Sequence, residues 1–173
     1  MIGGKPRGDI LVSDCGRVCQ GGAEVSSTRQ RSPWVNLRRS LRVGAWNVRS
    51  LREDDHQSLL SSKLKRLDIG IAALSEVQRP DCGEIIAGGY TYYWSGHSDD
   101  YHAQGVAVAV SNKLTPMIIE VTPVNEHIMR LRICHSLGVI SLVSAYAPTK
   151  ASDLTVKDAF YATLESVVVQ CPR

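Results

Sequence analysis

The chain has 173 residues, of which 43% are hydrophobic, so it can form one domain of ordinary size with a packed core. Its net charge of +3 is unevenly spread: residues 1–42 hold eight Lys or Arg against three Asp or Glu, leaving twelve against fourteen for residues 43–173. No apolar leader follows the first Met, and no stretch approaches the roughly 18 apolar residues of a membrane helix. We therefore expect a globular, nuclear or cytoplasmic protein that is neither secreted nor bound to a membrane.

Residues 1–41 are rich in Gly, Ser and Arg and have no periodicity, which predicts a disordered basic arm before a folded domain at 42–173. The stretch RSPWVNLRRS in this arm either contacts phosphates or is a solvated linker. The cysteines are odd in number and scattered, which argues against a disulfide framework and against zinc, and indicates free thiols in a reducing compartment. They are Cys15, Cys19, Cys82, Cys134 and Cys171.

The first predicted elements are a strand at LRVGAWNV (41–48), a helix at 55–66 capped by Asp54 or Asp55, and a buried strand at IGIAALSE (69–76). Short β-rich runs separated by Gly, Pro, Asn and Ser then predict a mostly antiparallel succession of strands. These runs are YTYYWSG, GVAVAV, MIIEV, IMRLRI and GVISLVSAY. Apolar residues at helical spacing predict a last helix at 153–170, capped by Ser152 and stopped by Pro172.

Three of these strands end in a polar side chain: Asn47, Glu76 and Tyr146. If the first helix is a right-handed crossover, the first two strands are parallel, and Asn47 and Glu76 emerge at the same sheet edge. A carboxylate with an amide suits Mg²⁺, and a phenol could donate to a phosphate oxygen. Singly, each residue has a structural alternative: a turn cap for Asn47, a solvated carboxylate for Glu76 and a packed corner for Tyr146.

Four ordered motifs carry a family resemblance: WNVRSL (46–51), ALSEVQRP (73–80), GVAVAVSNKL (105–114) and VSAYAPT (143–149). Together they resemble the endonuclease/exonuclease/phosphatase superfamily, over about residues 41–172. Within it they are most similar to the apurinic-endonuclease-like domain of RTE/BovB LINE retrotransposons and to craniofacial development protein 2-like host proteins. The resemblance implies a four-layer α/β sandwich of DNase I-like fold and a Mg²⁺-dependent phosphodiesterase that nicks DNA, with Mn²⁺ as an alternative metal.

Carried over by the resemblance, Glu76 is the metal-ligand glutamate, Asn47 lies near metal and phosphate, and Tyr146 contacts the phosphate. Arg49 stands where apurinic endonucleases carry an acidic residue, a departure that weakens the repair-enzyme interpretation. The family also has a Gly-Asp-Phe-Asn strand end after the last helix and an Asp-His pair near its C-terminus, which activate water and stabilise the transition state. Neither is found at those places here, so we expect this chain to be inactive.

The loop SGHSDDYH brings His97, Asp99, Asp100 and His102 together, but a polar hairpin loop explains it better than a metal site. Two-sheet sandwiches usually run to roughly 200–250 residues, so this chain should supply mostly the first sheet and its helices. The apolar side of GVAVAV, IMRLRI and GVISLVSAY would then be exposed and would need a second chain to cover it.

Three hypotheses follow from these observations. The first is a truncated N-terminal part of a DNA-nicking endonuclease. The second is a non-catalytic interaction protein derived from such an element. The third is another superfamily enzyme, such as a phosphatase, because the Asn and Glu motifs are shared across the superfamily.

Overall fold

The computed structural model describes residues 41–97, 104–135 and 138–171. The predicted basic arm therefore lies outside the described residues, apart from Leu41. So do Asp99, Asp100 and His102 of the polar loop.

The first sheet has five strands in the order β1-β2-β5-β4-β3. Helix α1 (Asp54–Arg66) connects β1 to β2, and these two strands are parallel, as predicted, with Asn47 opposite Ser75. The other neighbours in this sheet are antiparallel. The strands are β1 (Val43–Asn47), β2 (Ile71–Ser75), β3 (Cys82–Ala87), β4 (Tyr90–Ser95) and β5 (Val106–Ser111).

The second sheet has three antiparallel strands in the order β6-β7-β8. They are β6 (Ile118–Asn125), β7 (Ile128–His135) and β8 (Gly138–Ala145), and a short 3-10 helix, η2 (Thr115–Met117), precedes them. Helix α2 (Leu154–Val169) follows β8. The five predicted β-rich runs are thus present as strands β4 to β8, with shifted ends. The two strands predicted before them are present as β1 and β2.

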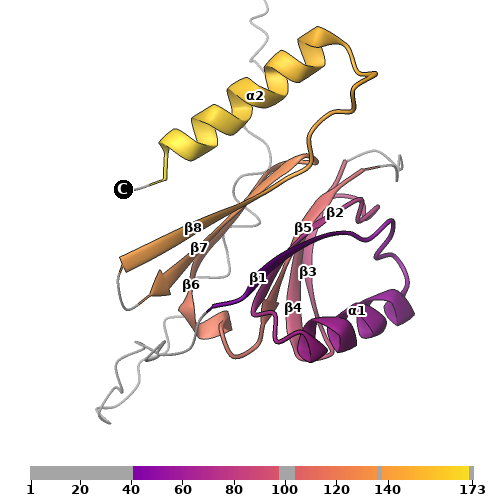
Figure 1. Ribbon diagram of the computed structural model, residues 1–173, viewed down its shortest axis with the longest axis vertical. Helices are drawn as coiled ribbons and strands as arrows, with labels where there is room; N and C mark the ends of the chain where they lie inside the picture. Colours follow the sequence, from indigo (N-terminus) through magenta and orange to yellow (C-terminus); the bar gives the residue numbers. More distant parts are fainter. Residues whose placement is uncertain (1–40, 98–103, 136–137, 172–173) are drawn as a thin grey trace, which may run out of the picture.

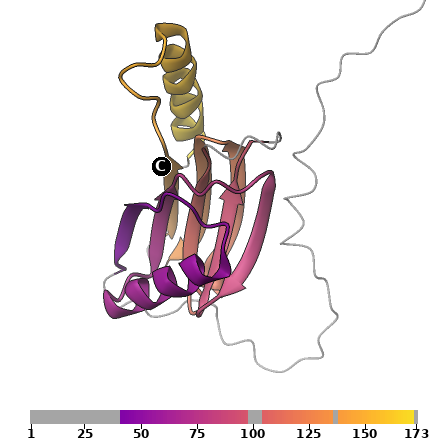
Figure 2. The same ribbon diagram turned by 90° about the vertical axis from the view of Figure 1, so that its right-hand side faces the viewer.

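The elements form four layers, seen from two sides in Figures 1 and 2: α1, the first sheet, the second sheet and α2. One apolar cluster joins α1 to the first sheet through Leu60, Leu64 and Leu74. A smaller apolar cluster packs Phe160 and Val167 of α2 against Ile128 of β7. This layer order is that of a DNase I-like α/β sandwich, which confirms the predicted fold class.

The expectation of an exposed inner sheet face is wrong. Residues Val106–Val110 of β5 are all buried, and alternate residues of β7, namely Met129, Leu131 and Ile133, share a cluster with Val108. The reason is that the last three strands do not extend the first sheet but make a second one, which stacks on it. Each sheet therefore covers the apolar face of the other.

Apolar surface is exposed instead on α2, where apolar residues occur on more than one side of the helix. Leu154, Tyr161 and Val168 repeat every seven residues and are 75%, 60% and 54% exposed, and Val169 is 77% exposed. None of these four residues belongs to the cluster around Phe160. Together these four residues form an exposed apolar stripe along α2.

The predicted caps are corrected by one residue at each helix. Glu53, not Asp54 or Asp55, is the N-cap of α1, and Asp153, not Ser152, is the N-cap of α2. Neither cap makes a side-chain hydrogen bond, so side-chain capping did not decide where the helices begin.

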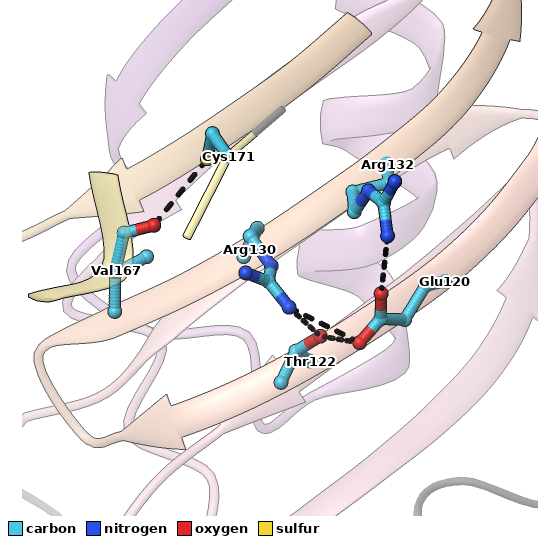
Figure 3. A network of polar contacts seen from close by, with 6 residues as sticks. All are labelled: Glu120, Thr122, Arg130, Arg132, Val167 and Cys171. Atoms are coloured by element: carbon cyan, nitrogen blue, oxygen red, sulfur yellow. Dashed lines mark hydrogen bonds and ion pairs between the residues drawn. The ribbon is translucent and has the colours of Figure 1, made fainter. Parts of the chain in front are cut away.

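The outward face of the second sheet carries an ionic network (Figure 3). Arg130 and Arg132 of β7 each donate to Glu120 of β6 across 3.2 Å, and Thr122 donates to the same carboxylate across 2.6 Å. These bonds hold the pKa of Glu120 below its ordinary value, with the Thr122 hydroxyl as the largest cause. The network ties β6 to β7 on the face opposite the apolar core.

Candidate metal and phosphate site

Asn47, Glu76 and Tyr146 meet where β1, β2 and β8 end. Asn47 is the last residue of β1, whereas Glu76 and Tyr146 directly follow β2 and β8. The Asn47 side-chain amide donates to Glu76 Oε1 across 2.5 Å, and the Tyr146 hydroxyl donates to the same oxygen across 3.0 Å. The structure thus brings Asn47 and Tyr146 to one oxygen of the Glu76 carboxylate, so the three predicted site residues lie together.

Glu76 has a left-handed backbone, with φ of 57°, and so do Arg49 at 60° and Gln78 at 55°. Residues other than glycine rarely adopt this conformation, and such positions cluster at functional sites. Here the two chain segments that leave the parallel strands hold one another, because Val48 N donates to Ser75 O and Leu51 N donates to Val77 O. These bonds keep Glu76 in its strained conformation beside Asn47.

Tyr146 is held by His127, at the turn between β6 and β7. Tyr146 N donates to His127 O, and His127 Nδ1 lies 2.9 Å from Tyr146 O, within hydrogen-bond distance. The two rings are stacked, with centroids 6.2 Å apart and planes 17° from parallel. The hydrogen bond to Glu76, with burial and the carboxylate charge, raises the pKa of Tyr146, because these surroundings favour the phenol over the phenolate.

His127 was not among the predicted site residues, because by sequence it only flanks a strand. Its support of Tyr146 depends on β7 and β8 being paired so that Ile128 lies opposite Ala145, which places His127 beside Tyr146. The signal available in the sequence was its position directly before the apolar run IMRLRI, at the same end of a strand pair as VSAY. Without knowledge of the pairing between β7 and β8, the position of His127 in the sequence does not indicate a functional role.

The Glu76 carboxylate and the Asn47 amide suit Mg²⁺ better than a metal ion whose ligands must all come from the protein. Among the described residues, no group of three or more His, Cys, Asp or Glu side chains could hold an ion together. Glu76 Oε1 accepts two hydrogen bonds, and Asn47 Oδ1 accepts one from Arg49 N. Mg²⁺ commonly binds one or two carboxylates and keeps several waters, so one carboxylate with a neighbouring amide is a sufficient protein contribution.

An open groove of about 200 Å³ adjoins these residues, between the ends of β1, β2 and β8. Asn47, Ser75 and Ser144 supply its polar lining, and Trp46 and Ala145 contribute to the rest. The exposed Arg49 follows Asn47 by two residues, and its backbone N–H donates to Asn47 Oδ1. A ligand in this groove would therefore have access to solvent, to the Asn47 amide and to the hydroxyls of Ser75 and Ser144.

The fold and the placement of these residues at its strand ends define a DNase I-like α/β domain, and solved structures share it. The catalytic domain of APE2 from Xenopus laevis matches with a TM-score of 0.53 and 19% identity, over 73% of this chain and 54% of that chain. The AP endonuclease LMAP from Leishmania major matches with a TM-score of 0.55 and 13% identity, over 70% of this chain and 46% of that chain.

Among curated proteins, craniofacial development protein 2 from Bos taurus is 24% identical over 131 residues, as is that from Tragulus javanicus. These matches cover 76% of this chain but only 22% of each relative. No family model matches the chain. The curated matches bear out the resemblance to craniofacial development protein 2 seen in the sequence, and the solved structures show that the chain shares the fold of AP endonucleases.

Within the described ranges, no helix has the length and apolar content that crossing a bilayer requires.

Proposed function

We propose that residues 42–173 are the N-terminal part of a Mg²⁺-dependent phosphodiesterase domain that acts on DNA, of the retrotransposon endonuclease type. The observation that carries the proposal is the convergence of Asn47 and Tyr146 on Glu76 at the strand ends. The similarity to two AP endonucleases, which share only the fold, supports it.

Each residue has a role that follows from its chemistry. Glu76 supplies the negative charge that holds the metal, and Asn47 fixes the carboxylate and offers a neutral amide beside it. The Tyr146 phenol, which is protonated at neutral pH, donates to a phosphate oxygen when the ligand is bound. Bound Mg²⁺, or Mn²⁺, would neutralise phosphate charge and polarise the P–O bond.

We propose further that this chain binds DNA without cleaving it efficiently. A water-activating aspartate and a histidine that stabilises the transition state, the two groups expected of the family, are not found at the expected places in the 173 residues. Loss of a general base alone typically costs about 10²–10⁴ in rate, and loss of an electrostatic stabiliser adds a similar factor. The localisation in keeping with a DNA ligand is nuclear, with the basic arm as support.

The alternative is a non-catalytic interaction protein that binds a second chain. The inner sheet face first expected to do so is covered within the molecule, so the exposed stripe on α2 is the surface that would serve. Such a protein would ignore Mg²⁺, whereas the proposed DNA-binding site would depend on it.

The test is fluorescence anisotropy with a labelled DNA duplex, with and without Mg²⁺, on the wild-type chain and Glu76→Gln. We expect Mg²⁺ to strengthen binding and Glu76→Gln to weaken it about tenfold, a loss of about 1.4 kcal/mol. Glu84→Gln, which changes an exposed carboxylate on the far edge strand β3, is the matched control. Binding that responds neither to Mg²⁺ nor to Glu76→Gln would refute the proposal.

Plasmid nicking measured on the same samples tests the expected inactivity. Nicking by the wild-type chain that Glu76→Gln abolishes would contradict inactivity while supporting the metal site.

A further inference from the structure

A second groove, of about 350 Å³, lies between the β6–β7 turn and the first half of α2. We call it the α2 groove. Its polar lining includes Glu126, His127 and Thr163, and its apolar floor includes Ala159 and Phe160. Its volume is at the lower end of the range, about 300–1,000 Å³, in which small ligands are bound.

The α2 groove begins one side chain away from Tyr146. His127, which lines the groove, stacks on the Tyr146 ring and bonds to its backbone, and Phe160 packs edge-on against the same imidazole at 6.2 Å. Pro148, two residues beyond Tyr146, also lines the groove. His127 therefore links the candidate site to the groove, because it contacts Tyr146 and also lines the groove.

The charge of the lining decides which part of a nucleotide the groove suits. Glu126 lies in it, 3.7 Å from His127 Nε2, and a carboxylate repels a phosphate brought beside it. The same carboxylate accepts hydrogen bonds from the amino groups of bases, and hydroxyls such as Thr163 pair with either kind of base edge. The apolar floor suits the faces of the sugar and base. The phosphate therefore belongs at Glu76, where the proposed Mg²⁺ would offset the charge of the carboxylate, and the uncharged groups belong in the groove.

We propose that the α2 groove is a subsite for the sugar and base of the nucleotide adjoining the phosphate held at Glu76. The inference rests on the proposed function, because it assigns the groove to the same DNA strand. His127 then acts as a positioning residue: it forms one wall of the subsite and fixes the tyrosine that contacts the phosphate.

The test fills the groove from α2. Ala159 is exposed and lines the groove, so Ala159→Trp should occupy it without disturbing the core. Ala162→Trp is the matched control, since Ala162 is exposed on the same helix and is not part of the lining. Two labelled single strands of equal length serve as probes in Mg²⁺: ordinary DNA, and a strand whose bases are replaced by abasic spacers.

We expect Ala159→Trp to weaken binding of ordinary DNA about tenfold, in line with the energy usually lost with one bound base, and to affect the abasic strand less. Glu76→Gln should weaken both probes, because both carry phosphates. If Ala159→Trp does not fold, Thr155→Tyr fills the groove from its exposed rim.

The outcomes separate the two proposals. If Glu76→Gln weakens binding but Ala159→Trp behaves like Ala162→Trp on both probes, the subsite is refuted and the proposed function stands. If the wild-type chain binds neither probe, both are refuted. Equal losses for both probes with Ala159→Trp would overturn the assignment to a base.

Discussion

The Tyr146 hydroxyl lies 3.0 Å from Glu76 Oε1, although 70 positions separate the two residues in the chain. The contact spans the two sheets, because Glu76 follows β2 of the first sheet and Tyr146 follows β8 of the second. The candidate site therefore exists only when the sheets are stacked.

This contact predicts a shift in the titration of Tyr146. The pKa of the phenol is raised above 10.0, chiefly by its hydrogen bond to Glu76, so Glu76→Gln should lower it toward that value. The sign follows because a nearby carboxylate favours the neutral phenol over the phenolate. NMR titration of the tyrosine ring carbons measures it, with Glu84→Gln as control. An unchanged Tyr146 pKa in Glu76→Gln would contradict the contact.

The stacking of the two sheets predicts a large effect at Leu131 and a small one at Val139. Leu131 is fully buried between the sheets, so Leu131→Ala should lower the free energy of unfolding by about 2–5 kcal/mol. Val139, 43% exposed on β8, should change it by no more than about 0.5 kcal/mol when replaced by Ala. Urea denaturation compares the two. Similar small losses at both positions would mean that the sheets are not packed together.

The network at Glu120 predicts a stability difference that depends on pH. The folded-state pKa of Glu120 lies below its ordinary value of 4.5, so the ionised carboxylate stabilises the fold above that pH. Glu120→Gln should cost about 1 kcal/mol at neutral pH, since the group is partly exposed, and the difference from wild type should shrink as pH falls below 4.5. Chemical denaturation at several pH values measures it. A difference that does not depend on pH would exclude the ionised network.

The apolar stripe on α2 predicts self-association. Exposed apolar residues that continue along a helix are unusual for a monomer, so the wild-type chain should associate as its concentration rises. Val168→Lys should reduce this, whereas Ser166→Lys, also exposed on α2, should not. Sedimentation velocity over a range of concentrations gives the answer. A wild-type chain that stays monomeric throughout would contradict the prediction.

Much of this architecture was predictable from local patterns. The parallel pairing of β1 and β2 follows from a strand-helix-strand order, and it correctly places Asn47 beside Glu76. Strand β3 was missed, because its residues CGEIIA alternate between exposed and half-buried positions at a sheet edge and contain only two β-branched side chains. An edge strand receives less help from burial, so its composition is a weaker signal.

The division of the strands into two sheets could not be predicted in the same way. The apolar run of β5 and the alternating pattern of β7 fit one long sheet as well as two stacked ones, since local pattern does not say which strand faces which. The support that His127 gives to Tyr146 depends on that same long-range pairing. The division into two sheets and the contact between His127 and Tyr146 both depend on tertiary structure, and no local sequence pattern indicates either of them.

The most direct test of the central claim, that Asn47, Glu76 and Tyr146 form a metal and phosphate site, is metal binding itself. Mn²⁺ would be titrated into wild-type, Glu76→Gln and Glu84→Gln chains, and the broadening of side-chain amide signals would be followed by NMR. We expect the Asn47 amide to broaden first in the wild type and in Glu84→Gln, and we expect Glu76→Gln to remove this effect. Broadening of Asn47 that is equal in Glu76→Gln, or absent from the wild type, would contradict it.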